Sequence, residues 1–157
     1  MPVSENDNTF ANDKLIIMES QQKRQLDNID NSLKWHFFNM YCMALSDTDF
    51  DPKEAELLYK IGLEHGLDKT LIDEIVVTSG LRPEIPATIE EKVSYLYDLT
   101  RMAWADDEIK EEERLVLLKN ILRFGFKEEN KIQILDYLIE SVRDGKTLDQ
   151  IITEIKA

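Results

Sequence analysis

Apolar side chains recur along most of the chain at intervals of three and four residues, which is the spacing of one face of an α-helix. Alternation of apolar and polar positions, which is typical of a half-buried strand, gives no convincing strand. The helical stripes are clearest at these positions: Leu26, Ile29, Leu33, Phe37, Met40 and Ala44; Val93, Leu96, Leu99 and Ala103; Leu148, Ile151, Ile152 and Ile155. We therefore predict an all-α fold with about seven or eight helices.

Capping residues predict where several of these helices begin. Asp13 and Asp68 stand before apolar periodic stretches, where a short polar side chain can accept hydrogen bonds from the first free amides. Asp51 comes directly before Pro52, which is the order of an N-cap and the first helical position. Thr88 is followed three residues later by a glutamate, as in a capping box. The last helix is expected to begin near residue 147.

The first stripe has two features of its own. Polar residues 30–32 interrupt it, so the segment 13–45 is either one long helix or two shorter ones. Trp35, Phe38 and Tyr41 widen the apolar face beyond a single stripe. The helix that ends this segment is therefore expected to be buried on most sides and to be central to the core.

One stretch of the chain occurs twice, at Met43 to Leu67 and at Met102 to Phe126, with a constant shift of 59 positions and no gap. Each copy contains the end of an apolar helix, an acidic loop, and an amphipathic helix closed by glycine. The matched or similar pairs are Met43 and Met102, Ala44 and Ala103, Asp47 and Asp106, Asp49 and Glu108, Phe50 and Ile109, Glu54 and Glu113, Leu58 and Leu117, Lys60 and Lys119, Leu63 and Leu122, and Gly66 and Gly125. In the second amphipathic helix the residues expected to face inward are Leu115, Leu118, Ile121 and Leu122.

The repeat suggests a single domain built from two pseudo-repeated halves. Residues 82–86 contain two prolines and form the linker that separates the copies. The expected organisation is a disordered N-terminus at 1–12, an all-helical domain at 13–157 with halves at about 30–80 and 88–140, and a C-terminal helix at 147–156.

Charge and composition restrict the classes of partner. The net charge is −13, with 19 basic and 32 acidic residues among 157, which argues against a surface that binds nucleic acid. Cations and basic protein surfaces are the electrostatically natural partners. The apolar runs are shorter than the ~20 residues of a membrane span, and the N-terminus lacks the basic and apolar regions of a secretory signal. The single cysteine, Cys42, is expected to be a small buried apolar residue, and a reducing cytoplasm is the simplest location.

The two acidic loops are the main candidates for chemistry. Both place carboxylates around one apolar residue, Phe50 or Ile109. Calcium and similar hard cations take six to eight oxygen ligands, and closely spaced acidic residues can supply several of them. With Asp47 counted as the first ligand, the turn glycine and the bidentate glutamate of an EF-hand are both missing, so a metal site here would need another geometry.

Helix capping explains part of the same pattern without a metal. The acidic residues that follow each loop, including Glu54 and Glu113, lie in the first turn of a helix, where the helix dipole favours negative charge. Asp47 and Asp106 follow the carboxyl end of a helix, where that dipole opposes a carboxylate. A cation, a lysine, water or the amides of the next helix could each offset this, and the alternatives stay open.

The repeated pattern of Met-Ala, a loop aspartate, an apolar residue and a helix-start glutamate resembles the TerB-like family of tellurite-resistance proteins and the related N-terminal domain of certain membrane-anchored J-domain co-chaperones. The resemblance covers roughly residues 33–138. It implies an all-helical fold with two pseudo-symmetric halves and a metal site. Calcium or magnesium is the ion we expect at the acidic loops, because both take oxygen ligands. The residues it nominates as ligands are Asp47, Asp49 and Glu54 in the first half, and Asp106, Glu108 and Glu113 in the second.

The sequence departs from the family's pattern at the loops. The family usually has glycine after the loop aspartate, where this chain has Thr48 and Asp107. Aspartate tolerates a left-handed backbone better than threonine does, so the second loop is closer to the family. At the expected cap position before the next helix stands Lys110 instead of Ser, Thr or Asp.

Other residues give little sign of catalysis. His36 lies in the most apolar helix and His65 aligns with Phe124, so both are interpreted as partly buried structural residues. No nucleophile elbow, glycine-rich phosphate loop or HExxH spacing is present.

From these features we expect a non-catalytic, stress-associated binding module whose acidic loops hold a divalent cation or a basic protein segment. The alternatives are a purely structural interaction domain without metal, and a metal-dependent hydrolase, which would need an open coordination position in a concave pocket.

Overall fold

The computed structural model of the chain describes residues 11–17, 25–45, 52–78 and 81–157, and all regular structure within them is helical. The elements are α2 (Asn31–Leu45), α3 (Pro52–Glu64), α4 (Lys69–Val77), α5 (Ile89–Ala103), α6 (Glu111–Arg123), the short 3-10 helix η1 (Glu128–Asn130), α7 (Lys131–Arg143) and α8 (Leu148–Lys156). Residues 11–17 and 25–28 are helical as well. The predicted all-α fold is confirmed.

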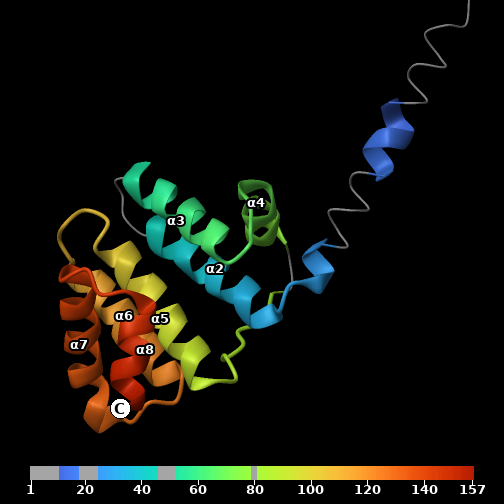
Figure 1. Ribbon diagram of the computed structural model, residues 1–157. Coiled ribbons are helices and arrows are strands. Elements are labelled where there is room, and N and C mark those ends of the chain that lie inside the picture. The colour runs from blue at the N-terminus through green and yellow to red at the C-terminus, as the bar shows by residue number, and fades with distance from the viewer. Residues whose placement is uncertain (1–10, 18–24, 46–51, 79–80) are drawn as a thin grey trace, which may run out of the picture.

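Helix α5 occupies the centre of the molecule. It packs against α2, α3, α6, α7 and α8, so it has neighbours from both halves of the chain. Figure 1 shows α2, α3 and α4 as one group of helices, with α5 to α8 as a second group beside it. A single cluster of buried apolar side chains runs through both groups, from Phe37 in α2 to Leu138 in α7. The two halves therefore share one hydrophobic core.

The repeat in the sequence is a repeat in the structure. A shift of 59 residues carries the bounds of α3 onto those of α6 without any difference, and carries α2 onto α5 within one residue. Leu58 and Leu117 occupy matched positions and both are fully buried. Met43 and Met102 are likewise buried at matched positions near the ends of α2 and α5. Equivalent residues thus contribute equivalently to the core.

Most of the predicted helix starts are confirmed. Asp68 accepts a hydrogen bond from the amide of Leu71 at 2.9 Å at the start of α4. Thr88 accepts one from the amide of Glu91 at 3.1 Å at the start of α5. Thr147 begins α8 with a complete capping box. Each bond satisfies an amide that has no partner inside its own helix.

The N-terminal part differs from the expectation in two details, and it decides one alternative that the sequence leaves open. Asp13 lies inside the helical segment 11–17 instead of capping its start, which is consistent with an acidic side chain in a first helical turn. The same segment shows that residues 11 and 12 belong to a helix, while residues 1–10 lie outside the part that the structure describes. The chain breaks its helix at residues 29 and 30, so α2 begins as a separate helix, and the carboxylate of Asp30 accepts a 3.4 Å hydrogen bond from the amide of Ser32.

Two predictions of burial were wrong. Leu115 in α6 is 56% exposed, because the inward face of this helix carries Glu113, Leu117 and Asn120. Cys42 in α2 is exposed, because Met40 and Met43 on either side of it take the inward positions. In both cases the helix is turned so that a neighbouring residue faces the core.

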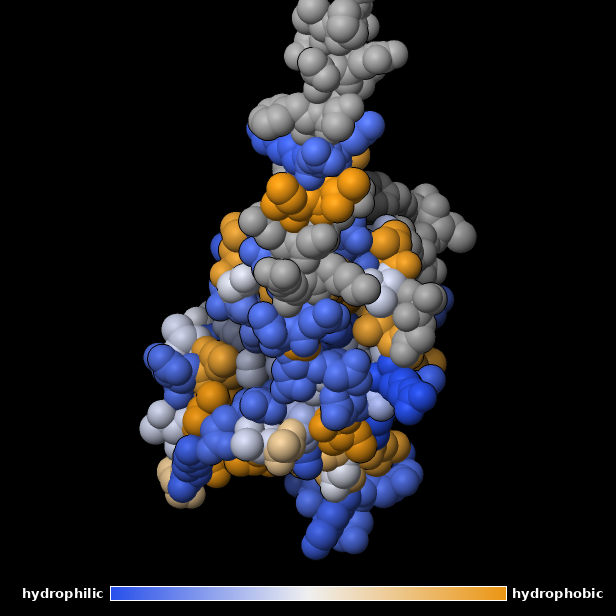
Figure 2. Space-filling view, turned by 90° about the vertical axis from the view of Figure 1, so that its right-hand side faces the viewer, coloured by the Kyte–Doolittle hydropathy of each residue, from blue (hydrophilic) through white to orange (hydrophobic). Residues whose placement is uncertain are grey.

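The surface is mostly hydrophilic, with smaller hydrophobic areas among the polar ones on the face drawn in Figure 2. Scattered exposed apolar residues of this kind are normal for a folded protein. None of the helices in the described ranges is long and apolar enough to cross a lipid bilayer.

Candidate functional site

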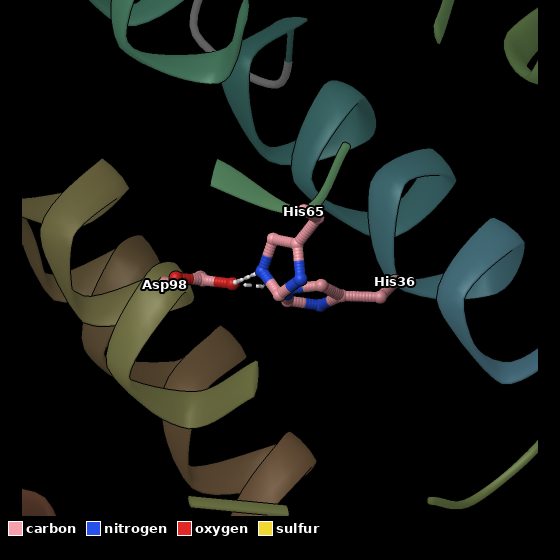
Figure 3. Close-up of side chains that lie close together, drawn as sticks. All are labelled: His36, His65 and Asp98. Atoms are coloured by element: carbon pink, nitrogen blue, oxygen red, sulfur yellow. Dashed lines mark hydrogen bonds and ion pairs between the residues drawn. The ribbon is translucent and has the colours of Figure 1, made fainter. Parts of the chain in front are cut away.

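Three side chains from separate elements meet between the two halves of the molecule. His36 comes from the middle of α2, His65 from the residue after α3, and Asp98 from the middle of α5 (Figure 3). The Nε2 atoms of both rings point at one oxygen of the carboxylate, with His36 Nε2 at 3.0 Å and His65 Nε2 at 2.7 Å from Asp98 Oδ2. We refer to these three residues as the His-Asp-His cluster.

The helical period places two members of the cluster in the core. His36 stands three residues after Leu33 and four before the fully buried Met40, so it falls on the inward stripe of α2. Asp98 stands three residues after Tyr95 and four before Met102, on the inward stripe of α5. As a result His36 is only 2% exposed and Asp98 only 3%.

The turn after α3 places the third member. Helix α3 ends at Glu64, and Gly66 has a φ of +79°, a left-handed conformation that a glycine adopts without strain. The amide of Leu67 then donates to the carbonyl of Gly62 at 2.8 Å, which closes the turn. This turn directs the ring of His65 toward Asp98 and leaves its side chain 21% exposed.

Aromatic rings enclose the buried side of the cluster. The ring of Tyr95 is stacked on that of His36 at a centroid distance of 4.1 Å and an angle of 5°. The hydroxyl groups of Tyr95 and Ser32 lie 3.4 Å apart. Phe37 meets the ring of His65 edge to face at 5.6 Å. These contacts restrict both imidazoles to one orientation.

Burial and hydrogen bonding decide the charges of the cluster. Burial by itself raises the pKa of Asp98, but the hydrogen bonds from His36 and His65 act more strongly together, so the pKa of this carboxyl lies below its ordinary value. Burial lowers the pKa of His36 below its ordinary value, although Asp98 acts in the opposite direction. An ionised carboxylate only accepts hydrogen bonds, so both Nε2 atoms carry the hydrogen in this arrangement. At neutral pH the cluster is therefore a carboxylate with a neutral His36.

A surface ion pair borders the cluster. Arg101, one turn after Asp98 on α5, makes a bidentate pair with Glu64, with N–O distances of 2.6 and 3.1 Å. Its Nη1 atom lies 3.9 Å from Asp98 Oδ1. Because Arg101 pairs with Glu64, the carboxylate of Glu64 compensates most of the positive charge of Arg101, and this weakens the attraction between Arg101 and Asp98.

A cavity of about 310 Å³ opens next to the cluster. Its wall includes both His65 and Asp98, along with Arg101, Tyr97, Thr147 and Leu148. His36 is buried in the core and does not line the cavity. The cluster is thus closed on one side by the core and open to a hollow on the other.

The cluster has the composition and size of a three-ligand metal site. One ligand atom from each residue lies within 4.8 Å of the other two. In a tetrahedral zinc site with bonds of about 2.0–2.1 Å, neighbouring ligand atoms are roughly 3.3 Å apart. The observed N–O distances of 3.0 and 2.7 Å would need to widen by roughly 0.3 and 0.6 Å to reach that spacing. A bound ion would replace the Nε2 hydrogens, which would then reside on Nδ1 of each ring.

The acidic residues proposed from the sequence are not members of the His-Asp-His cluster. Asp47 and Asp49 lie outside the described residues, so their prediction is not tested. Glu54 and Glu113 are buried in the first turns of α3 and α6, at matched positions of the repeat.

The candidates in the second acidic loop differ in burial, and their prediction as metal ligands is not tested. Asp106 is half-buried and Glu108 is exposed. Among the described residues, three or more potential ligands converge only at the His-Asp-His cluster. Asp107 has a φ of +60°, which agrees with the expectation that this position takes a left-handed backbone.

The sequence does not reveal the cluster, because Asp98 is 62 positions from His36 and 33 positions from His65. Both histidines were interpreted as structural. A signal was nevertheless present, since His36 and Asp98 each stand on an apolar helical stripe where a polar residue needs a partner. Two such residues on two helices of one core are candidates to pair with each other.

Comparisons with known proteins do not add a function. No family model matches the chain, and no curated protein or solved structure matches it. The resemblance to the TerB-like family stays a prediction, and the function has to be argued from the geometry of the site.

Proposed function

We propose that this chain is a non-catalytic binding module for a divalent cation, and that the cation is held by His36, His65 and Asp98. The observation that supports this most directly is the convergence of two imidazole nitrogens and one carboxylate oxygen from three elements. Buried polar groups of this kind need partners, and a metal ion satisfies all three ligand atoms at once.

The ligand set favours zinc or a similar transition metal. Two imidazoles and one carboxylate suit zinc, whereas calcium and magnesium take mainly oxygen ligands. This proposal therefore differs in metal and in position from calcium or magnesium at the acidic loops. The loops contain oxygen ligands alone and remain the alternative site.

Binding would connect the two halves of the domain. Two ligands come from the first half, on α2 and after α3, and the third comes from α5 in the second half. An ion that binds only the folded chain adds RT ln(1 + [L]/Kd) to its stability, which is about 2.7 kcal/mol at a hundredfold excess over Kd. The cation would thus tighten a contact that the apolar core already makes.

The test is a calorimetric titration of chelator-stripped protein with zinc, calcium and magnesium, with thermal melting alongside. We expect one equivalent of zinc to bind and to raise the melting temperature. Asp98→Asn should lose this binding, and Asp106→Ala should retain it. His65→Gln is a second variant at a partly exposed position, where folding is least at risk.

The other outcomes would each select an alternative. Calcium binding that is lost in Asp106→Ala and kept in Asp98→Asn would move the site to the second acidic loop. Absence of any saturable heat or melting shift would overturn the proposal and make the cluster a structural hydrogen-bond network, with a basic protein segment as the remaining partner of the acidic surface. None of these measurements tests a role in the stress response, which the family resemblance suggests.

A metal-dependent hydrolase is the second candidate, because the cavity beside His65 and Asp98 is concave and adjoins the proposed metal position. Its test is turnover of generic ester and phosphate substrates by zinc-loaded protein. Activity that disappears in both the chelator-treated protein and Asp98→Asn would establish it in place of the non-catalytic role.

A further inference from the structure

The proposed metal position has an unfilled side that faces a cavity. Zinc in proteins is commonly four-coordinate, and three protein ligands leave one position for an external ligand. His36 approaches from the core, while His65 and Asp98 form part of the cavity wall. The fourth position therefore points toward the hollow of about 310 Å³.

A bound cation would reverse the charge of this cavity. The charged side chains on its wall are Glu64, Asp98 and Arg101, which sum to one negative charge. With a divalent ion on neutral imidazoles the same region carries one positive charge. A cavity that repels anions without the metal would attract them with it.

The remaining wall suits a small organic molecule. Tyr97 and Leu148 offer apolar surface, and Ser94 and Thr147 offer hydroxyl groups. The volume of about 310 Å³ leaves room for a small organic molecule beside the proposed metal position. A carboxylate head at the metal and a short aliphatic body against Tyr97 and Leu148 would use both kinds of surface.

On this basis we propose that the metal-loaded site takes a small organic carboxylate as its external ligand, with the carboxylate at the fourth coordination position and the body in the adjacent cavity. This inference rests on the proposed function, since without the cation the cavity has the wrong charge. Oxygen coordination to the ion supplies the affinity, and the apolar wall supplies the preference for an organic body over inorganic phosphate.

The experiment uses cobalt as the metal, because zinc has no visible spectrum. Cobalt-loaded full-length protein is titrated with acetate, butyrate, butanol and inorganic phosphate while the visible absorption bands are followed. We expect saturable changes with acetate and butyrate and none with butanol. Butyrate should bind about tenfold tighter than acetate, because each methylene group transferred from water to an apolar wall adds to the affinity. Phosphate should bind more weakly than butyrate.

Two variants separate the parts of the proposal. Leu148→Ala, a half-buried position on the cavity wall, should bind cobalt as the parent does but lose most of the preference of butyrate over acetate. Asp98→Asn should fail to bind cobalt.

Failure of the inference is distinguishable from failure of the metal site. If cobalt binds and none of the anions changes its spectrum, the carboxylate inference is overturned and the metal site stands. If phosphate binds more tightly than butyrate, the ligand class is wrong. If cobalt does not bind at the His-Asp-His cluster, the proposed function fails, and the inference fails with it.

Discussion

The His-Asp-His cluster and its counterpart in the repeat differ in polarity although they stand on matching helices. The shift of 59 residues that carries α2 and α3 onto α5 and α6 places Tyr95 opposite His36, Phe124 opposite His65, and Asn39 opposite Asp98. Tyr95 is stacked directly on His36, so the two matched rings meet at the boundary between the halves. The positions of the cluster carry a carboxylate and two imidazoles, whereas the matched positions, which we call the neutral side, carry an amide and two aromatic rings.

The polar residue on the neutral side, Asn39, makes hydrogen bonds of a different kind. The side-chain amide of Asn39 donates to the oxygen of Asn120 at 3.0 Å, and Asn120 donates to the carbonyl of Val116 at 2.9 Å. These bonds need no charge. The comparison indicates that the repeated scaffold itself does not require the charged cluster.

The largest loss of stability is expected at buried core positions that match between the two halves. Leu58→Ala and Leu117→Ala each remove a fully buried side chain at matched positions, and each should lower the free energy of unfolding by about 3 kcal/mol. Urea denaturation monitored by circular dichroism measures both. Leu63→Ala and Leu115→Ala, at exposed positions of the same helices, should change it by less than about 0.5 kcal/mol. A large loss in only one of the two buried variants would contradict a core shared equally between the halves.

The next largest loss of stability is expected at the His-Asp-His cluster, where the two halves differ. Asp98→Asn gives the cluster the residue type of its counterpart. It should lower the free energy of unfolding by about 2 kcal/mol, because the hydrogen bonds from His36 and His65 then end on a neutral amide oxygen and lose their charge assistance. The same denaturation measurement applies, and zinc binding should disappear. As the control, Asn39→Asp adds a carboxylate to the other side, and it should not create zinc binding, because Tyr95 and Phe124 offer no imidazole. Unchanged stability in Asp98→Asn would contradict the geometry of the cluster.

Acid should lower the stability of the protein through the His-Asp-His cluster. The pKa of His36 is below its ordinary 6.5 in the folded chain, so below about pH 6.5 the unfolded chain takes up a proton that the folded chain does not, and stability falls. The pKa of Asp98 is below its ordinary 3.8, so its contribution is present above that pH and is lost on further acidification. Unfolding free energies at pH 7.5 and 5 measure the first of these effects.

His36→Gln provides the control for this pH dependence. The amide nitrogen of glutamine can still donate to Asp98, but it does not titrate. The loss of stability between pH 7.5 and 5 should therefore be smaller in His36→Gln than in the parent. An equal loss in both proteins would assign the acid sensitivity to other groups.

The smallest effect is expected at the border of the cluster. Arg101→Gln removes the ion pair with Glu64, whose carboxylate is about half exposed, and should lower the free energy of unfolding by about 0.5 kcal/mol. High salt should reduce the difference between the parent and this variant. Arg123→Gln, on α6 at the position that matches Glu64 in the repeat, removes a guanidinium that lies over the ring of Trp35 at 5.9 Å, and it should have a similarly small effect. A loss of several kcal/mol in Arg101→Gln would show that Asp98 depends on this arginine.

The sequence predicted most of the fold because the relevant signals are local. Helical stripes, caps such as Thr88 and turns such as Gly66 each depend on residues within one or two helical turns of one another. The errors at Leu115 and Cys42 arose where several apolar residues lie close together in one helix and only some of them can face the core, since periodicity alone leaves such a choice open.

The candidate site could not be predicted in the same way. Acidic loops are conspicuous in a sequence because their carboxylates are neighbours, and for this reason Asp106 and Glu108 are predicted as metal ligands. The cluster joins residues that only the packing of α2 against α5 brings together.

The sequence by itself therefore determined the helices, their order, the repeat of 59 residues and the acidic character of the surface. The tertiary structure alone decided that His36, His65 and Asp98 meet at one oxygen atom beside a cavity. The physical reason is that helix formation depends on short-range periodicity and capping, whereas a site assembled from distant positions depends on how the helices rotate and pack when they bury their apolar faces.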